Sequence, residues 1–291
     1  MISAHLLEQF YACYKTGFDL GIYKIGLTDN PKMFDKNELL NNSLKAMLFF
    51  TQYAHERGGT NRNFSRYHRI SIQKCMGERM FEDILLNDDN FPDNVWKEFK
   101  ELTKEWTGKP RPNEPRTIGA VKNVLIKLKE SKEANIIRLL GNMNLESASE
   151  FLRNLKGIKE KISALFLRDL QEYYNFWKMN ESNLYLLQPV DRWVDRFSKA
   201  CWLNYISSGS KDEEAKQIIK FCCADEVNPI HFNMGVWFVG SYYIDLCNFH
   251  NIPENRTMDL DYCINRFDID KIIKAIKNYT LNFITGDNFS L

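Results

Sequence analysis

Two short segments, 154–165 and 188–194, carry residue types that can attack a sugar carbon and stabilise the charge that develops there. In the first, Gly157 interrupts a helical pattern, and Lys161 falls in the first turn of the helix expected to follow. In the second, a proline precedes Asp191, which is placed to cap the next helix. Apolar neighbours and the positive helix end disfavour the charged form of Lys161, and the neutral amine is the nucleophile. The two segments therefore predict a lysine nucleophile assisted by a carboxylate.

The glycine turn also predicts an anion site. Backbone N–H groups at the start of a helix have no intrahelical partner, and they can hold a phosphate without regard to base sequence. Lys156 and Lys159 flank Gly157 and add positive charge. We expect these three residues to contact a nucleic-acid backbone.

Helical spacing of apolar residues dominates the rest of the chain, which is 44% hydrophobic and has only 14 Gly and 8 Pro in 291 residues. The pattern predicts an all-α protein of two helical lobes with a cleft between them. The helices are expected at about 36–56, 93–106, 118–128, 134–140, 146–155, 160–177, 191–205, 213–223, 229–249 and 268–283. Weak extended patterns occur at 22–27 and 182–187, and the Pro-rich stretch 107–116 predicts a long loop.

Charge and cysteine content narrow the class of protein. The formal net charge is +1, so contact with DNA would need local basic patches. The seven cysteines are scattered and lack C-x-x-C spacing, which favours free thiols in a reducing cytoplasm over a zinc site or disulfide framework. The first ten residues lack a signal-peptide pattern, and the apolar stretch 227–244 is broken by polar residues, as in a buried helix.

Two patterns in the chain resemble the helix–hairpin–helix DNA glycosylases. They are Leu-x-Gly-Ile-x-x-Lys, which ends at Lys161, and Pro-Val-Asp-x-x-Val, in which Asp191 is the acid. Their long separation is most like the archaeal-type 8-oxoguanine DNA glycosylase/lyases. The resemblance implies that residues 1–291 form one glycosylase-like unit of two helical subdomains, with the hairpin at about 146–177. It also implies that Lys161 forms a Schiff base with C1′ of the damaged nucleotide while Asp191 assists base departure.

The same resemblance assigns a base pocket. Gln52 lies where the family has a pocket glutamine, Trp237 fits a stacking role, and Leu165 and Asn233 complete the pocket. Asn233 stands where a carboxylate is usual, and Lys159 stands where the hairpin usually has a second glycine. A satisfied core amide at Gln52 and a core position for Trp237 are the competing interpretations.

A basic segment, 55–79, resembles the loop that these enzymes insert into the gap left by a flipped base. The expected DNA contacts are Asn61, Arg62, Asn63 and Arg66. The adjoining Tyr67 and His68 are expected to stack on bases or wedge between them. A solvated basic face is the alternative interpretation.

The sequence thus predicts a DNA repair enzyme that excises an oxidised purine, 8-oxoguanine, and nicks the strand as an AP lyase in base excision repair. The expected partner is double-stranded DNA with a damaged base, and the chemistry requires no metal or organic cofactor. We expect a cytoplasmic, nucleoid-associated monomer that does not contact membranes. The alternatives are a non-catalytic helix–hairpin–helix DNA-binding protein and a glycosylase for another damaged base.

Overall fold

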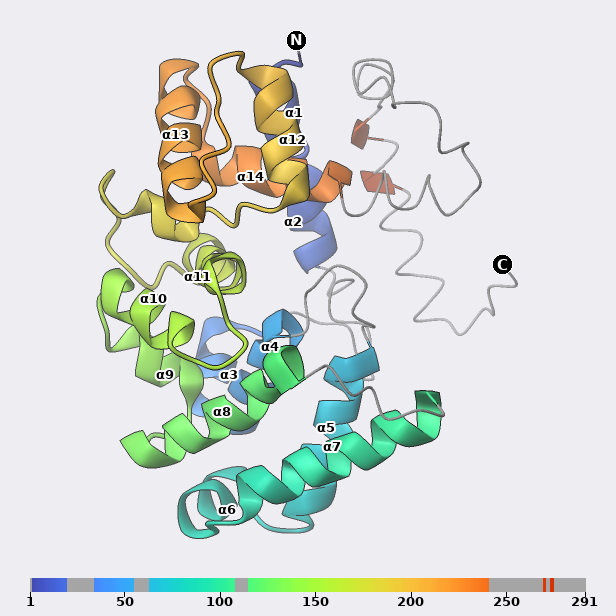
Figure 1. The fold of residues 1–291 in the computed structure, drawn as a ribbon. Coiled ribbons are helices and arrows are strands. Elements are labelled where there is room, and N and C mark those ends of the chain that lie inside the picture. Colours follow the sequence, from blue (N-terminus) through green and yellow to red (C-terminus); the bar gives the residue numbers. More distant parts are fainter. Residues whose placement is uncertain are drawn as a thin grey trace. The chain divides into compact units, whose positions relative to one another are not determined.

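The computed structural model describes residues 2–19, 34–54, 63–107, 115–240, 269–270 and 273–274. These residues form helices and connecting turns, with no strand among them (Figure 1). The predicted all-α class is confirmed. The weak extended pattern at 22–27, most of the loop at 107–116 and most of the predicted helix at 268–283 lie outside the described residues.

The chain divides into two compact units. Unit 1 combines Met1–Tyr23 with Asn180–Leu291, and unit 2 is the continuous segment Lys24–Met179. The described N-terminal helices therefore pack with the described part of a segment that begins more than 150 residues further along the chain by these bounds.

Unit 2 is built around one buried helix, α4. Its helices are α3 (Lys36–Asn41), α4 (Ser43–Ala54), α5 (Asn63–Met76), α6 (Phe81–Asn87), α7 (Phe91–Thr107), α8 (Pro115–Ser131), α9 (Ile136–Gly141), α10 (Leu145–Arg153) and α11 (Glu160–Tyr174). Six of them, α3, α5, α6, α8, α9 and α11, contact α4. Because α4 is apolar on almost every side, it can be buried by neighbours all around it.

The single helix predicted at 36–56 is two helices. Asp35 and Glu38 form a capping box at the start of α3. Asn42 then leaves helical geometry, with φ −129° and ψ 101°, and its side chain accepts the Lys45 N–H at 2.9 Å. The prediction was wrong at this point because an asparagine can cap a new helix as well as continue the old one.

Unit 1 is assembled on α14. Its elements are α1 (Ala4–Gln9), α2 (Tyr11–Asp19), the 3₁₀ helix η2 (Leu184–Leu187), α12 (Arg192–Cys201), α13 (Lys211–Ala224) and α14 (Pro229–Phe238). Helices α1, α2, α12 and α13 all contact α14 (Figure 1). A Cβ at Gly235 would lie 1.8 Å from the Leu7 carbonyl oxygen, so only glycine allows α1 to approach α14 this closely.

The other helices predicted within the described residues are present, with different ends. Helix α11 stops at Tyr174 because Asn175 adopts a left-handed conformation, with φ 50°. Helix α12 stops at Cys201 instead of 205, and the extended pattern at 182–187 is wrong because Leu184–Leu187 form η2. Helix α14 ends at Phe238, and residues 241–249 of that prediction lie outside the described part of the chain. Among the described residues, no helix has both the length and the apolar character needed to cross a membrane.

Candidate functional site

The glycine turn predicted from the sequence lies between α10 and α11, which pack on each other. Gly157 has φ 94°, a conformation that L side chains rarely adopt, and the Ile158 N–H donates to the Leu155 carbonyl at 2.9 Å. Lys159 is extended, with φ −122° and ψ −179°, which any residue can adopt. The turn therefore requires its glycine at 157 but accommodates a lysine at 159.

The start of α11 presents positive charge and uncapped amides. Lys156 and Lys159 are exposed on either side of Gly157. Lys159 is the N-cap residue of α11, and its side chain makes no capping hydrogen bond. The first-turn N–H groups of this 15-residue helix are therefore not satisfied by an N-cap side chain, which suits an anion.

Lys161 and Leu165 lie one helical turn apart on α11. Lys161 is partly buried, and Leu165 is only 1% exposed. Gln52, also partly buried, lies on α4, which packs against α11. Unit 2 therefore places Gln52 and Lys161 on two helices in contact with each other.

A buried polar network that the sequence did not predict holds α4 to α11. Arg168 is fully buried and donates from both Nε and Nη2 to Asp169 Oδ1, each at 2.9 Å. The other oxygen, Oδ2, accepts from the Tyr53 hydroxyl at 2.9 Å, and Tyr53 follows Gln52 on α4. The only signal for this cluster was an Arg-Asp pair within an apolar helical stretch. The network fixes the position of Gln52's helix relative to that of Lys161.

Asp191 caps α12, as the sequence predicts. Its Oδ1 accepts the backbone N–H groups of Trp193 at 2.8 Å and Val194 at 3.0 Å. The side chain remains partly exposed. This N-cap prediction is confirmed, and the carboxylate sits at the positive end of a helix dipole.

The other unit 1 residues of the predicted site are buried. Asn233 is fully buried and donates from Nδ2 to the Pro189 carbonyl at 3.5 Å. Trp237, one turn further along α14, packs edge-to-face on Tyr14 with ring centroids 6.3 Å apart. Asn233 therefore supports the segment that leads into Asp191.

The basic segment is largely helical. Residues 63–76 form α5, with Arg66 exposed; Asn61 and Arg62 lie outside the described residues, as does the side chain of Asn63. The expectation that Tyr67 and His68 stack with or wedge into DNA is wrong. Both are buried, because one side of α5 packs on α7, and His68 stacks on Phe99 with ring centroids 3.7 Å apart.

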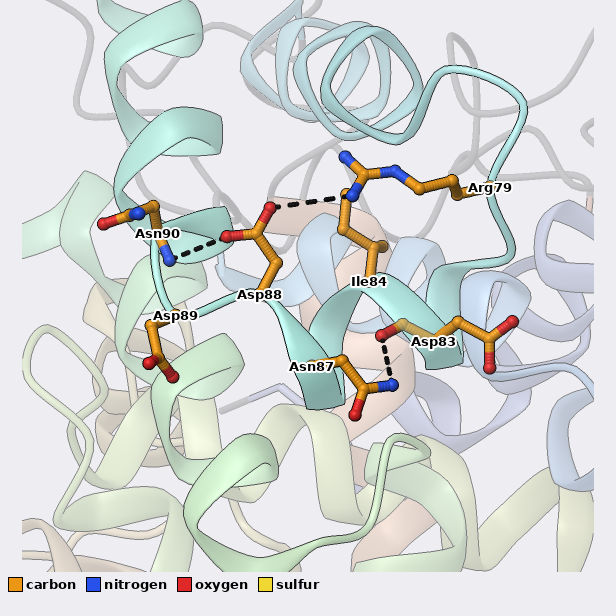
Figure 2. Close-up of a pocket in the computed structure, with 7 residues that line it drawn as sticks. All are labelled: Arg79, Asp83, Ile84, Asn87, Asp88, Asp89 and Asn90. Carbon is orange, nitrogen blue, oxygen red and sulfur yellow. Dashed lines mark hydrogen bonds and ion pairs between the residues drawn. The ribbon is translucent and has the colours of Figure 1, made fainter.

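A pocket of about 490 Å³ lies on unit 2, and none of the predicted site residues lines it. It is lined by Arg79, Asp83, Ile84, Asn87, Asp88, Asp89 and Asn90. Figure 2 shows Arg79 turned toward Asp88, and the two side chains form an ion pair of 3.8 Å. Asp89 forms an ion pair with Lys129 at 2.5 Å. The described residues contain no group of three or more His, Cys, Asp or Glu arranged to hold a metal ion. The carboxylates of Asp88 and Asp89 are engaged by neighbouring cations, and nothing in the pocket points to a ligand.

The predicted site residues divide between the two units. Unit 2 contains Gln52, Arg66, Lys156, Gly157, Lys159, Lys161 and Leu165, and unit 1 contains Asp191, Asn233 and Trp237. Each group is assembled by contacts within its own unit.

Comparison with known proteins assigns no family. No family model matches the chain, and no solved structure matches it. A stretch of 75 residues is 33% identical to the uncharacterised protein MJECL21 of Methanocaldococcus jannaschii, covering 24% of this chain and 17% of that protein. The aligned part is thus a small fraction of either protein.

Proposed function

We propose that this protein is a DNA glycosylase with AP lyase activity that removes an oxidised purine, 8-oxoguanine, through a lysine Schiff base. The observation that carries the proposal is the turn at Gly157, with two exposed lysines beside it and Lys161 one residue into α11. This arrangement combines a phosphate-binding helix start with an amine nucleophile within five residues.

In the proposed complex, the amides at the start of α11 bind a DNA phosphate together with Lys156 and Lys159. Phosphate contacts of this kind position the duplex without reading its sequence. Arg66, exposed on α5, adds a further contact, as do the neighbouring Asn61, Arg62 and Asn63 in the proposal. The damaged nucleotide must rotate out of the stack before its sugar is accessible to an amine.

The proposed reaction begins with attack of the neutral Lys161 amine on C1′. The bond between C1′ and the base breaks, and the base leaves with the bonding electrons and takes up a proton. Loss of the amine proton opens the sugar ring to an imine, and removal of a C2′ proton then expels the 3′-phosphate by β-elimination. Strand nicking therefore accompanies base release, and no external oxidant or reductant is required.

Asp191 would stabilise the positive charge that develops on the sugar as the base departs. Its fixed orientation supports this role, because two backbone N–H groups hold Oδ1 in place. Gln52, Leu165, Asn233 and Trp237 would surround the base. Lys161 belongs to unit 2 and Asp191 belongs to unit 1.

Borohydride trapping tests the proposal directly. Borohydride reduces the imine to a stable amine, so wild-type protein mixed with a duplex carrying 8-oxoguanine should form a covalent adduct. The adduct should vanish in Lys161→Gln. Lys159→Gln is the matched control, because it removes an exposed lysine two residues away and should weaken DNA binding without abolishing the adduct at saturating protein.

Two other outcomes would redirect the proposal. Binding to duplex DNA with no adduct on any damaged base would contradict catalysis and favour a non-catalytic DNA-binding protein. An adduct on another lesion but not on 8-oxoguanine would overturn the substrate while leaving the chemistry intact.

A further inference from the structure

Gln188 is a buried amide without a hydrogen-bond partner at either end. Its residue is 3% exposed, and neither Oε1 nor Nε2 has a partner among the described residues. Its backbone N–H donates to the Tyr185 carbonyl at 3.2 Å. Burying an amide in this state costs free energy, because both groups lose hydrogen bonds to water and gain none.

Gln171 shows what a satisfied amide looks like in the same protein. Its Oε1 accepts the backbone N–H of Trp177 at 2.8 Å, and its Nε2 donates to Asn175 Oδ1 at 3.1 Å. Gln171 is also buried, at 9% exposure. The described residues can therefore satisfy both ends of a buried glutamine amide at 171, and none of them does so at 188.

The place of Gln188 in the chain links it to the proposed site. Asp191 follows Gln188 by three positions, so their Cα atoms are at most about 11 Å apart. The intervening Pro189 is held by Asn233 of α14, and Trp237 follows Asn233 by one helical turn. All five residues belong to unit 1. Gln188 thus lies on the segment that the proposed chemistry already uses.

We propose that Gln188 reads the edge of the excised base, and that this base is a 6-oxopurine. This inference rests on the proposed function. An amide offers one acceptor and one donor side by side, which matches a neighbouring ring N–H and carbonyl oxygen. In a 6-oxopurine these are a ring N–H, which donates to Oε1, and O6, which accepts from Nε2. The bound base then satisfies the two groups for which the described residues offer no partner.

If Gln188 reads the base, removing its amide should not lower the stability of the free protein but should weaken recognition of the base. Gln188→Met removes both polar groups at similar length, so the melting temperature should stay the same or rise. Gln171→Met, the matched control, removes two satisfied groups and should lower it. Binding is measured in a Lys161→Gln background, which prevents turnover. The quantity compared is the affinity for a duplex with 8-oxoguanine divided by the affinity for one with a tetrahydrofuran abasic site. Gln188→Met should lower this ratio about ten- to hundredfold. Gln171→Met, compared at a temperature where it is folded, should keep the wild-type ratio.

Several results would overturn the assignment. If Gln188→Met lowers the melting temperature as much as Gln171→Met does, the Gln188 amide is satisfied inside the free protein. The second variant, Gln188→Leu, should then show the same decrease. Unchanged preference for 8-oxoguanine in a stable Gln188→Met, with a wild type that still forms the borohydride adduct, overturns the role of Gln188 alone. A wild type that forms no adduct on any lesion overturns the proposed function, and the assignment with it.

Discussion

Asn233 on α14 donates its Nδ2 to the carbonyl oxygen of Pro189, two residues before Asp191, at 3.5 Å. Both residues are in unit 1, and Asn233 is fully buried. The family resemblance places a carboxylate at this position, and a carboxylate has no donor for a carbonyl. The observed asparagine therefore has a structural reason in this chain: it can hold the Pro189 segment where an ionised acid would repel it.

Asn233→Asp should destabilise the protein by about 2–5 kcal/mol at neutral pH, because it buries a charge against a carbonyl oxygen. Burial and the carbonyl would raise the pKa of the new carboxyl above its unfolded value of about 3.9. Because this pKa is higher in the folded state, the variant loses stability relative to wild type as the pH rises above the pKa of the unfolded state. Denaturant unfolding at pH 5 and pH 8 should show the larger loss at pH 8.

Asn228→Asp is the control for that substitution on the same helix. Asn228 is exposed, and its Oδ1 caps α14 by accepting the N–H groups of Ile230 and His231. Aspartate caps as well as asparagine, so stability should change little. Equal stability of the two variants at both pH values would contradict the role assigned to Asn233.

Asp191→Asn separates the capping role of Asp191 from its proposed catalytic role. Asparagine preserves the cap, so the melting temperature should stay near that of wild type, while excision of 8-oxoguanine should fall by about 10²–10³ because the charge is lost. Asp191→Ala should lose both the cap, at about 1 kcal/mol, and the activity. Full activity in Asp191→Asn would show that the carboxylate is a cap and nothing more.

Gly157→Ala should destabilise the α10–α11 turn by about 1–2 kcal/mol, because φ 94° is unfavourable for a residue with a Cβ. In the proposed function it should also weaken duplex binding, measured by fluorescence anisotropy at low salt. Gly119→Ala is the matched control on α8, where the nearest atom to the added Cβ is Asn123 Nδ2 at 3.6 Å. That variant should gain up to about 1 kcal/mol from helix propensity. A Gly157→Ala protein as stable as Gly119→Ala would argue against the turn geometry.

Cys222 and Cys223 are neighbours on α13 with opposite environments. Cys222 is buried and Cys223 is exposed. Burial raises the pKa of the Cys222 thiol well above its usual 9.0, and it raises that of Cys13 to about 12. Because the thiolate is the reactive form, iodoacetamide at pH 8 should label Cys223 in the native protein and leave the other two until unfolding. Fragment-ion mass spectrometry resolves the adjacent pair, and equal labelling of both would contradict the packing of α13.

The part of the site that the sequence predicted correctly is local. The cap at Asp191 connects atoms two and three residues apart, and the turn at Gly157 depends on one residue's conformation. The helices follow from contacts three and four residues apart, so apolar spacing reveals them. By itself, then, the sequence determined the all-α class, most of the helices, the glycine turn and the cap.

Tertiary structure decided which polar and aromatic residues are buried, and with what. Tyr53 meets Asp169 across 116 residues, and Asn233 meets Pro189 across 44. The sequence predicted that His68 contacts DNA, but in the fold His68 stacks on Phe99 of α7. The residues around Gly235 in the sequence gave no indication that Leu7 would contact Gly235. Such contacts depend on which helix faces are brought together in space, and local spacing does not carry that information.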